Sequence, residues 1–233
     1  MLEVGNRLVS RSESNASETS HCSNDVKIRH GPLLFATTLR YNNRMPIRYS
    51  VPFFSQYSDI QSHLWQYRGC GIIALKMLLE YWHTQKPELQ SPSIEELLKK
   101  SFDIGAYIEN IGWSHSGLVE IAKRYGYGGY NKDLAHIPAE DAWQEFLEDL
   151  ERFPVMVSAY KHFDPEIKGG HIIVVTGKDE ERLYVNDPLE GNEERGKQII
   201  DLKKFLAGWK QRYIVVYPLA YDSIITAGYE TKL

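Results

Sequence analysis

The pattern of apolar and polar residues divides the chain into a helical first half and a strand-rich second half. After Gly71 the apolar residues recur at helical spacing, and they cover more of the helix surface than a solvent-exposed helix would carry. These residues are Ile72, Leu75, Met77, Leu78, Leu79 and Trp82. We therefore expect a central, buried helix in this segment.

Three further helices are expected at residues 92–98, 116–124 and 138–152. In the first, Ser93 is placed to cap the helix and Glu96 to complete a capping box. The second is closed by the glycine-rich Gly126–Gly129, which we interpret as a helix stop. The third carries its apolar residues along one face, as an amphipathic helix does.

The second half of the chain has the shorter period of β-strands. Strands are expected at residues 155–160, 172–176, 183–186, 198–200 and 213–217, with a short helix at 201–209 between the last two. Upstream, the extended runs 33–39 and 47–54 flank an Asn-Asn turn and could form a hairpin. Helices followed by a meander of strands indicate an α+β fold, with a mostly antiparallel sheet packed on the central helix.

The chain of 233 residues is long enough for one sizeable core. Residues 1–45 form a polar extension, of which the first 30 are rich in Ser, Asn, Glu and Arg and are expected to be at least partly flexible. We place the folded domain at residues 46–220 and a C-terminal tail at 221–233.

Charge and composition exclude several classes of function. The net charge is −4 and no basic stripe is present, which argues against a nucleic-acid partner. No run approaches the roughly 20 apolar residues of a membrane span, and the N-terminus lacks the apolar core of a signal peptide. Two cysteines, Cys22 and Cys70, are too few for a disulfide framework. A reducing, cytoplasmic location is therefore expected.

Cys70 is the residue that most strongly suggests chemistry. It lies between two glycines, directly before the central helix. Unpaired N–H groups and the helix dipole favour a thiolate at this position, and the thiolate is the nucleophilic form. Glycine on either side permits a sharp turn and a close approach of a substrate. An isolated cysteine is more often a small buried hydrophobic residue.

His171 and Asp187 strengthen the case for catalysis. His171 opens one expected strand and Asp187 follows the next, 16 residues later (187 − 171). A tight turn between the strands would make them antiparallel and bring the two residues together. The carboxylate could then orient the imidazole that takes the thiol proton. Taken singly, His171 could be an ordinary loop or core histidine, and Asp187 a turn residue. Asn186 should face the opposite way.

An acyl-transfer site also needs hydrogen-bond donors for an oxyanion. The backbone N–H of Cys70 is one donor. The upstream candidates for a side-chain donor are Gln56, Gln61 and Gln66, and Gln56 is favoured because it ends an extended element.

These motifs, in this order, resemble the papain-like cysteine peptidases of the bacteriocin-processing type, over roughly residues 47–217. The resemblance rests on residues 51–57, Gly69-Cys70-Gly71, residues 112–118, Gly170-His171 and residues 186–188. Members of that family cut peptides after a double-glycine motif, often as a domain of an exporter, and many stand alone. The resemblance implies a papain-like fold with Cys70 as nucleophile, His171 as base, Asp187 as orienting residue and Gln56 as oxyanion donor. The longer spacing between Gln56 and Cys70 leaves Gln66 as the alternative donor.

The sequence therefore predicts a cysteine-dependent peptidase or amidase whose partner is a peptide or protein substrate. Two alternatives stay open. One is an acyltransferase or transglutaminase-like enzyme with the same triad, and the other is a catalytically silent peptide-binding module. Residues 1–30 could also silence the catalytic residues by blocking the cleft. No cofactor is expected, and no cluster has metal-ligand spacing. At the start of the 116–124 helix, His115 should cap or be solvated. Trp113 could line a substrate groove or pack, and packing is favoured.

Overall fold

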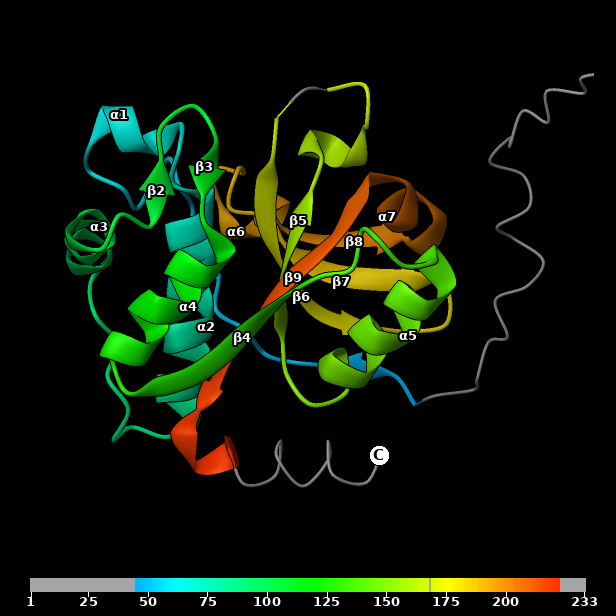
Figure 1. The fold of residues 1–233 in the computed structure, drawn as a ribbon, viewed down its shortest axis with the longest axis horizontal. Helices are drawn as coiled ribbons and strands as arrows, with labels where there is room; N and C mark the ends of the chain where they lie inside the picture. The colour runs from blue at the N-terminus through cyan, green and yellow to red at the C-terminus, as the bar shows by residue number, and fades with distance from the viewer. Residues whose placement is uncertain (1–44, 168, 223–233) are drawn as a thin grey trace, which may run out of the picture. The chain divides into compact units, whose positions relative to one another are not determined.

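The computed structural model describes residues 45–167 and 169–222, and Figure 1 shows their arrangement. The helices are α1 (His63–Gln66), α2 (Cys70–Gln85), α3 (Ile94–Asp103), α4 (His115–Arg124), α5 (Ala139–Leu150), α6 (Glu193–Gly196) and α7 (Leu202–Gly208), with 3₁₀ turns η2 (Lys161–Phe163) and η3 (Leu219–Tyr221). The strands are β1 (Ile47–Arg48), β2 (Tyr107–Ile108), β3 (Gly112–Trp113), β4 (Tyr127–Asp133), β5 (Val155–Ala159), β6 (His171–Lys178), β7 (Arg182–Asn186), β8 (Lys197–Asp201) and β9 (Trp209–Pro218).

One antiparallel sheet of seven strands organises this part of the chain. Its order is β4-β9-β5-β6-β7-β8, and β1 pairs with the last two residues of β6, beyond the stretch that pairs with β5. Strands β2 and β3 form a separate two-stranded ribbon. The sheet and the helices together confirm the α+β class, with the antiparallel sheet that the strand pattern predicted.

The helices cover both faces of the sheet (Figure 1). Helices α2 and α4 lie against one face, over β6 and over β4 and β9 respectively, whereas α5 packs against β9 from the other face. The α5 residue Phe146 meets the ring of Tyr213 edge-on, and both side chains are buried. This layered packing holds the ends of α2, β5 and β6 together at one end of the sheet.

Helix α2 is buried almost all round, as its unbroken apolar surface predicted. Residues Gly71 to Leu79 are all buried. The single charged side chain in this stretch, Lys76, donates to Glu80 Oε2 at 2.7 Å and to Ser91 Oγ at 2.8 Å. A charge in such a place must be paired, because burying it alone costs far more than any packing gain.

Several local expectations are confirmed. Ser93 and Glu96 form the capping box of α3, with both reciprocal hydrogen bonds present. The turn after Lys178 joins β6 and β7 as an antiparallel pair. The five strands expected in the second half of the chain and the helix before β9 are all present, with ends displaced by up to four residues.

Other expectations were wrong or incomplete. The segment after Gly126 is not only a helix stop, because Tyr127 opens the seven-residue strand β4. Strand β9 does not extend the meander from β8 but returns to lie between β4 and β5. Only two residues of the extended run 47–54 are strand. The 33–39 strand, Cys22, and residues 1–44 of the expected extension lie outside the described residues.

Candidate active site

Cys70 is the first residue of α2 and is partly exposed. The preceding Gly69 has φ −81° and ψ 0°, a conformation open to any residue. Glycine is needed there for a different reason from the one expected: a Cβ on Gly69 would collide with Ile60, and one on Gly71 would lie 2.6 Å from the Trp113 ring. The protein's own side chains, and not a substrate, take up the space beside both glycines.

His171 and Asp187 meet as the strand pairing predicted. His171 Nε2 and Asp187 Oδ1 are 2.6 Å apart, and both side chains are buried. Asp187 Oδ1 also accepts the Leu189 N–H at 2.9 Å, which fixes the carboxylate. Asn186 faces the other way, as expected, and donates to the carbonyl oxygens of Val51 and Pro52.

Cys70 and His171 line the same cleft, and the His171 ring acts on the pKa of the thiol. Burial raises the pKa of the thiol, but the hydrogen bond and the positive charge of His171 lower it, and the N–H groups of Ile172 and Gly71 lower it further. The lowering contributions outweigh burial, so the pKa of Cys70 lies below its ordinary value. Because Asp187 occupies Nε2, the Nδ1 atom of His171 is the ring nitrogen left for the thiol.

The partners shift the pKa of His171 in the opposite direction. Burial lowers this pKa, but the hydrogen bonds and negative charges of Asp187 and Cys70 raise it well above its ordinary value. For Asp187, burial raises the pKa, whereas the His171 hydrogen bond and charge lower it, with a net lowering. A low thiol pKa beside a high imidazole pKa favours a thiolate–imidazolium pair at neutral pH.

The three candidate glutamines have different surroundings. Gln56 is buried and lines the same cleft as Cys70, and its Nε2 donates to the Gln66 carbonyl at 2.6 Å. Gln66 is in α1, where its own Nε2 donates to the Ile60 carbonyl at 2.9 Å. Gln61 is exposed. Of these, only Gln56 is among the residues that line the cleft.

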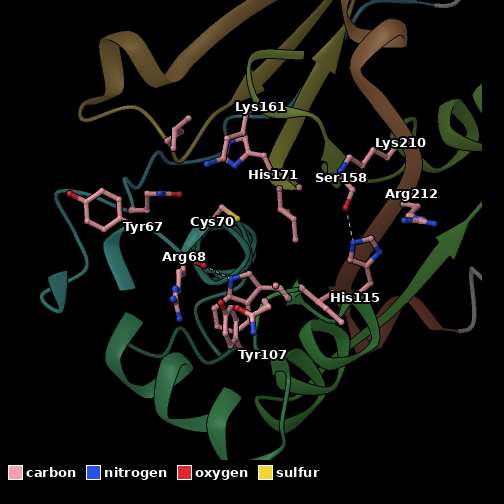
Figure 2. A pocket seen from close by; sticks show the side chains of 18 residues that line it. Tyr67, Arg68, Cys70, Tyr107, His115, Ser158, Lys161, His171, Lys210 and Arg212 are labelled. Atoms are coloured by element: carbon pink, nitrogen blue, oxygen red, sulfur yellow. Dashed lines mark hydrogen bonds between the residues drawn. The ribbon is translucent and has the colours of Figure 1, made fainter. Parts of the chain in front are cut away.

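A cleft of about 430 Å³ opens over Cys70 and His171. Figure 2 shows Tyr67 on one side of this pair, and Ser158, Lys210, Arg212 and His115 on the other. The walls come from α2, the β2–β3 ribbon, the start of α4, and strands β5, β6 and β9. The cleft therefore follows the end of the sheet, where the strands that carry His171 and Ser158 meet the helix that carries Cys70.

One cleft residue, His115, differs from its expected role, and Trp113 has an additional one. Ser114, not His115, caps α4, and His115 Nε2 lies 2.7 Å from Ser158 Oγ. The expectation that His115 would cap or be solvated was therefore wrong. Trp113 packs, as expected, with its Nε1 donating to the Arg68 carbonyl at 2.6 Å, but it also lines the cleft. No local pattern marks His115 or Ser158, because their contact joins residues 43 positions apart.

The site also contains no group of three or more His, Cys, Asp or Glu that could hold a metal ion, and none occurs elsewhere in the described residues.

The geometry can be compared with known proteins. The model of the peptidase C39-like family matches residues 48–216, which is most of the chain. The chain belongs to the peptidase C39-like family. This family consists of papain-like cysteine proteases that are related to bacteriocin-processing peptidases. Membership of this C39-like protein indicates peptidase activity. No curated protein matches it.

One solved structure agrees with the fold of this C39-like protein. A C39-like peptidase structure from Bacillus anthracis aligns with a TM-score of 0.52 at 18% identity, covering 75% of this chain and 98% of the other. A double-glycine motif protease from an AMS/PCAT transporter, solved with its leader peptide, aligns at 0.46 and 18% identity, covering 74% and 97%. The peptidase domain of Streptococcus ComA aligns at 0.46 and 19% identity, covering 65% and 93%. In the described residues of this chain, no helix has the length and hydrophobicity to cross a membrane.

Proposed function

We propose that this C39-like protein is a cysteine peptidase in which Cys70 attacks a peptide bond, His171 transfers protons and Asp187 orients the imidazole. The observation that carries the proposal is the chain of contacts from the partly exposed Cys70 thiol through His171 to the buried Asp187 carboxylate. This chain combines a nucleophile, a base and a group that orients the base, as covalent acyl transfer requires.

In the first half of the reaction, the Cys70 thiolate attacks the peptide carbonyl carbon and forms a tetrahedral oxyanion. When this intermediate collapses, the C–N bond breaks and His171 gives its proton to the departing amine. The products of this half are the free amine and a thioester on Cys70. The hydrogen bond from His171 to Asp187 keeps the ring aligned while its charge changes.

In the second half, His171 removes a proton from water as the water oxygen attacks the thioester. Collapse of the second tetrahedral intermediate breaks the C–S bond, releases the carboxylic acid and regenerates the thiolate. If an amine took the place of water, the same residues would carry out acyl transfer, so the geometry leaves product identity to experiment.

The oxyanion would be stabilised by two N–H donors. The Cys70 backbone N–H belongs to the first turn of α2 and has no carbonyl partner within the helix. The Gln66 carbonyl can only accept a hydrogen bond, so the Gln56 atom facing it must be Nε2, which keeps a second N–H. Gln56 Oε1 is fully buried and lacks a hydrogen-bond partner among the described residues, so it is not the atom that the cleft presents.

The direct test of this function is product analysis with a mixed peptide library. We expect the full-length protein to release fragments with new carboxyl termini, with or without an added amine, and the Cys70→Ala protein to release none. Mass spectrometry identifies both the fragments and any amine adduct. Amine adducts in place of free acids would assign the protein to acyl transfer, and uncut peptides under all conditions would contradict the proposal.

Replacing Gln56 with alanine should lower kcat by roughly 100-fold with little change in KM, because oxyanion donors act mainly in the transition state. The matched control is Gln66→Ala, which removes an amide of the same kind from α1, outside the cleft-lining set. Steady-state kinetics on one peptide compares the two. A larger loss of kcat in Gln66→Ala than in Gln56→Ala would assign the donor to Gln66.

A further inference from the structure

The charge of the cleft is opposite to the charge of the protein. The chain as a whole has a net charge of −4. The residues that line the cleft nevertheless include no Asp or Glu, and they include Arg68, Lys161, Lys210 and Arg212. Like charges gathered where no carboxylate lines the cleft raise the local potential and attract anionic ligands.

Two of these cations, Lys210 and Arg212, lie on one side of the Cys70–His171 pair around a polar floor, and Lys161 lies nearer to His171 in the same cleft (Figure 2). In the sheet, Ser158 lies directly opposite Ile172 on β6 and opposite Arg212 on β9, so the three side chains share one face. His115 reaches this floor from α4 through its contact to Ser158. Figure 2 shows Ser158, Arg212 and His115 close together beside Lys210. We call Lys161, Lys210, Arg212, His115 and Ser158 the cationic subsite.

Donors of the cationic subsite are left over for a ligand. Arg212 uses its Nε to contact Asp133 Oδ2 at 2.9 Å, and its terminal amino groups have no partner within residues 45–167 and 169–222. In the same residues, the Lys161 ammonium makes no hydrogen bond or ion pair, while Lys210 Nζ donates to the Gly169 carbonyl at 3.0 Å. A carboxylate could therefore be bound by the terminal amino groups of Arg212 while the contact to Asp133 is kept, and the Lys161 ammonium is a second free donor in the same cleft.

Burial and the charge of Arg212 lower the pKa values of two residues of the subsite, Lys210 and His115. Burial lowers the pKa of Lys210, and the charge of Arg212 lowers it further. Burial and Arg212 also lower the pKa of His115, against a smaller opposite effect of Asp133. The carboxylate that acts on the pKa of His115 belongs to Asp133. It lies on β4 and is not among the residues that line the cleft.

We propose that the cationic subsite binds the side-chain carboxylate of an aspartate or glutamate in the substrate, close to the bond that Cys70 attacks. In the β5–β6 pairing, Ser158 lies opposite Ile172, and Ile172 directly follows the proposed base His171. The subsite residue Ser158 is therefore a neighbour of His171 in the sheet. The subsite lines the same cleft as Cys70 and His171, and an extended peptide advances about 3.3 Å per residue, so the acidic residue is expected among the few residues on either side of the cut bond. This inference rests on the proposed function, and it adds the chemical class of the substrate.

Peptide pairs that differ only in Glu against Gln test the specificity. Starting from a peptide that the protein cuts, each of the three positions on either side of the cut bond is changed in turn. We expect wild-type kcat/KM to be roughly tenfold higher for Glu than for Gln at one position, as a charge-assisted hydrogen bond would give. In the Lys161→Gln/Arg212→Gln protein the ratio should fall to about one at that position.

The matched control is Lys203→Gln/Lys204→Gln, which removes the same net charge from two exposed positions on α7. This control should keep the wild-type preference for Glu. Equal rates for Glu and Gln at every position in the wild type would overturn the proposal, and so would a preference that survives in the Lys161→Gln/Arg212→Gln protein.

A binding measurement separates this proposal from the proposed function. Full-length Cys70→Ala protein is titrated with N-acetylglutamate amide and with N-acetylglutamine amide, and the ring resonances of His115 are followed by NMR. We expect the glutamate compound alone to shift them, with the shift lost in the added Lys161→Gln/Arg212→Gln background. If no peptide is cut but this pattern holds, the peptidase function fails and the subsite stands. Equal shifts by both compounds reject the subsite whatever the activity.

Discussion

The Cys70→Ala protein should lose peptide hydrolysis by at least about 10⁴-fold, the scale seen when a nucleophile is removed from a triad. No acyl-enzyme can form without the sulfur, and His171 then has no thiol proton to accept. The expected cost to folding is small because Cys70 is partly exposed and alanine is only slightly smaller. Initial rates on a cleaved peptide and a thermal unfolding curve measure the two effects, and the midpoint should move by only a few °C.

The Cys22→Ala protein is the matched control, because it removes the chain's other thiol. It should retain wild-type turnover. Hydrolysis that persists in Cys70→Ala at a rate near wild type would exclude Cys70 as the nucleophile. A collapse of the thermal transition in Cys70→Ala would instead show that the loss of activity came from unfolding.

Replacing His171 with alanine should change the pH dependence of Cys70 alkylation by iodoacetamide. In the wild type the pKa of the thiol is lowered, so the reactive thiolate persists below the ordinary value of about 8.5 and is lost only as the pH falls through the lowered pKa. His171→Ala removes the hydrogen bond and the charge that lower this pKa and leaves the burial that raises it. We expect alkylation at pH 6 to slow by about tenfold or more.

Turnover and alkylation should differ at high pH. Because the pKa of His171 is raised, its imidazolium stays protonated through neutral pH. It loses the proton only as the pH rises through this raised pKa. Turnover needs that proton for the leaving amine and should therefore decline there, whereas alkylation needs only the thiolate and should not. Intact-mass labelling and a parallel rate profile from pH 4 to 11, a range that passes the His171 pKa of about 10, measure both, with exposed His136→Ala as the control. A pH profile of alkylation unchanged in His171→Ala would contradict the Cys70–His171 pair.

Local patterns predicted most of the fold elements. The apolar run after Cys70 and the Ser93–Glu96 box predicted α2 and the start of α3, because hydrophobic periodicity and capping depend on residues close in sequence. Strand β4 was missed because its Gly128 and Gly129 read as a helix stop. In the sheet, a Cβ on Gly128 would meet the Tyr217 ring, and one on Gly129 would lie 2.8 Å from the Val215 carbonyl oxygen, so the bare backbone is what lets β4 pair with β9.

By itself, the sequence determined the buried helix that begins at Cys70 and the antiparallel pair that brings His171 to Asp187, since both depend on periodicity and on one short turn. The tertiary structure alone decided that Gln56 and not Gln66 lines the cleft. The side-chain amide of Gln56 is held by a hydrogen bond of 2.6 Å to the carbonyl of Gln66, ten residues away. It alone also brought Arg212 beside Ser158, because β9 returns to pair with β5. Strand order is set by the free energy of packing the whole sheet, which no local pattern encodes.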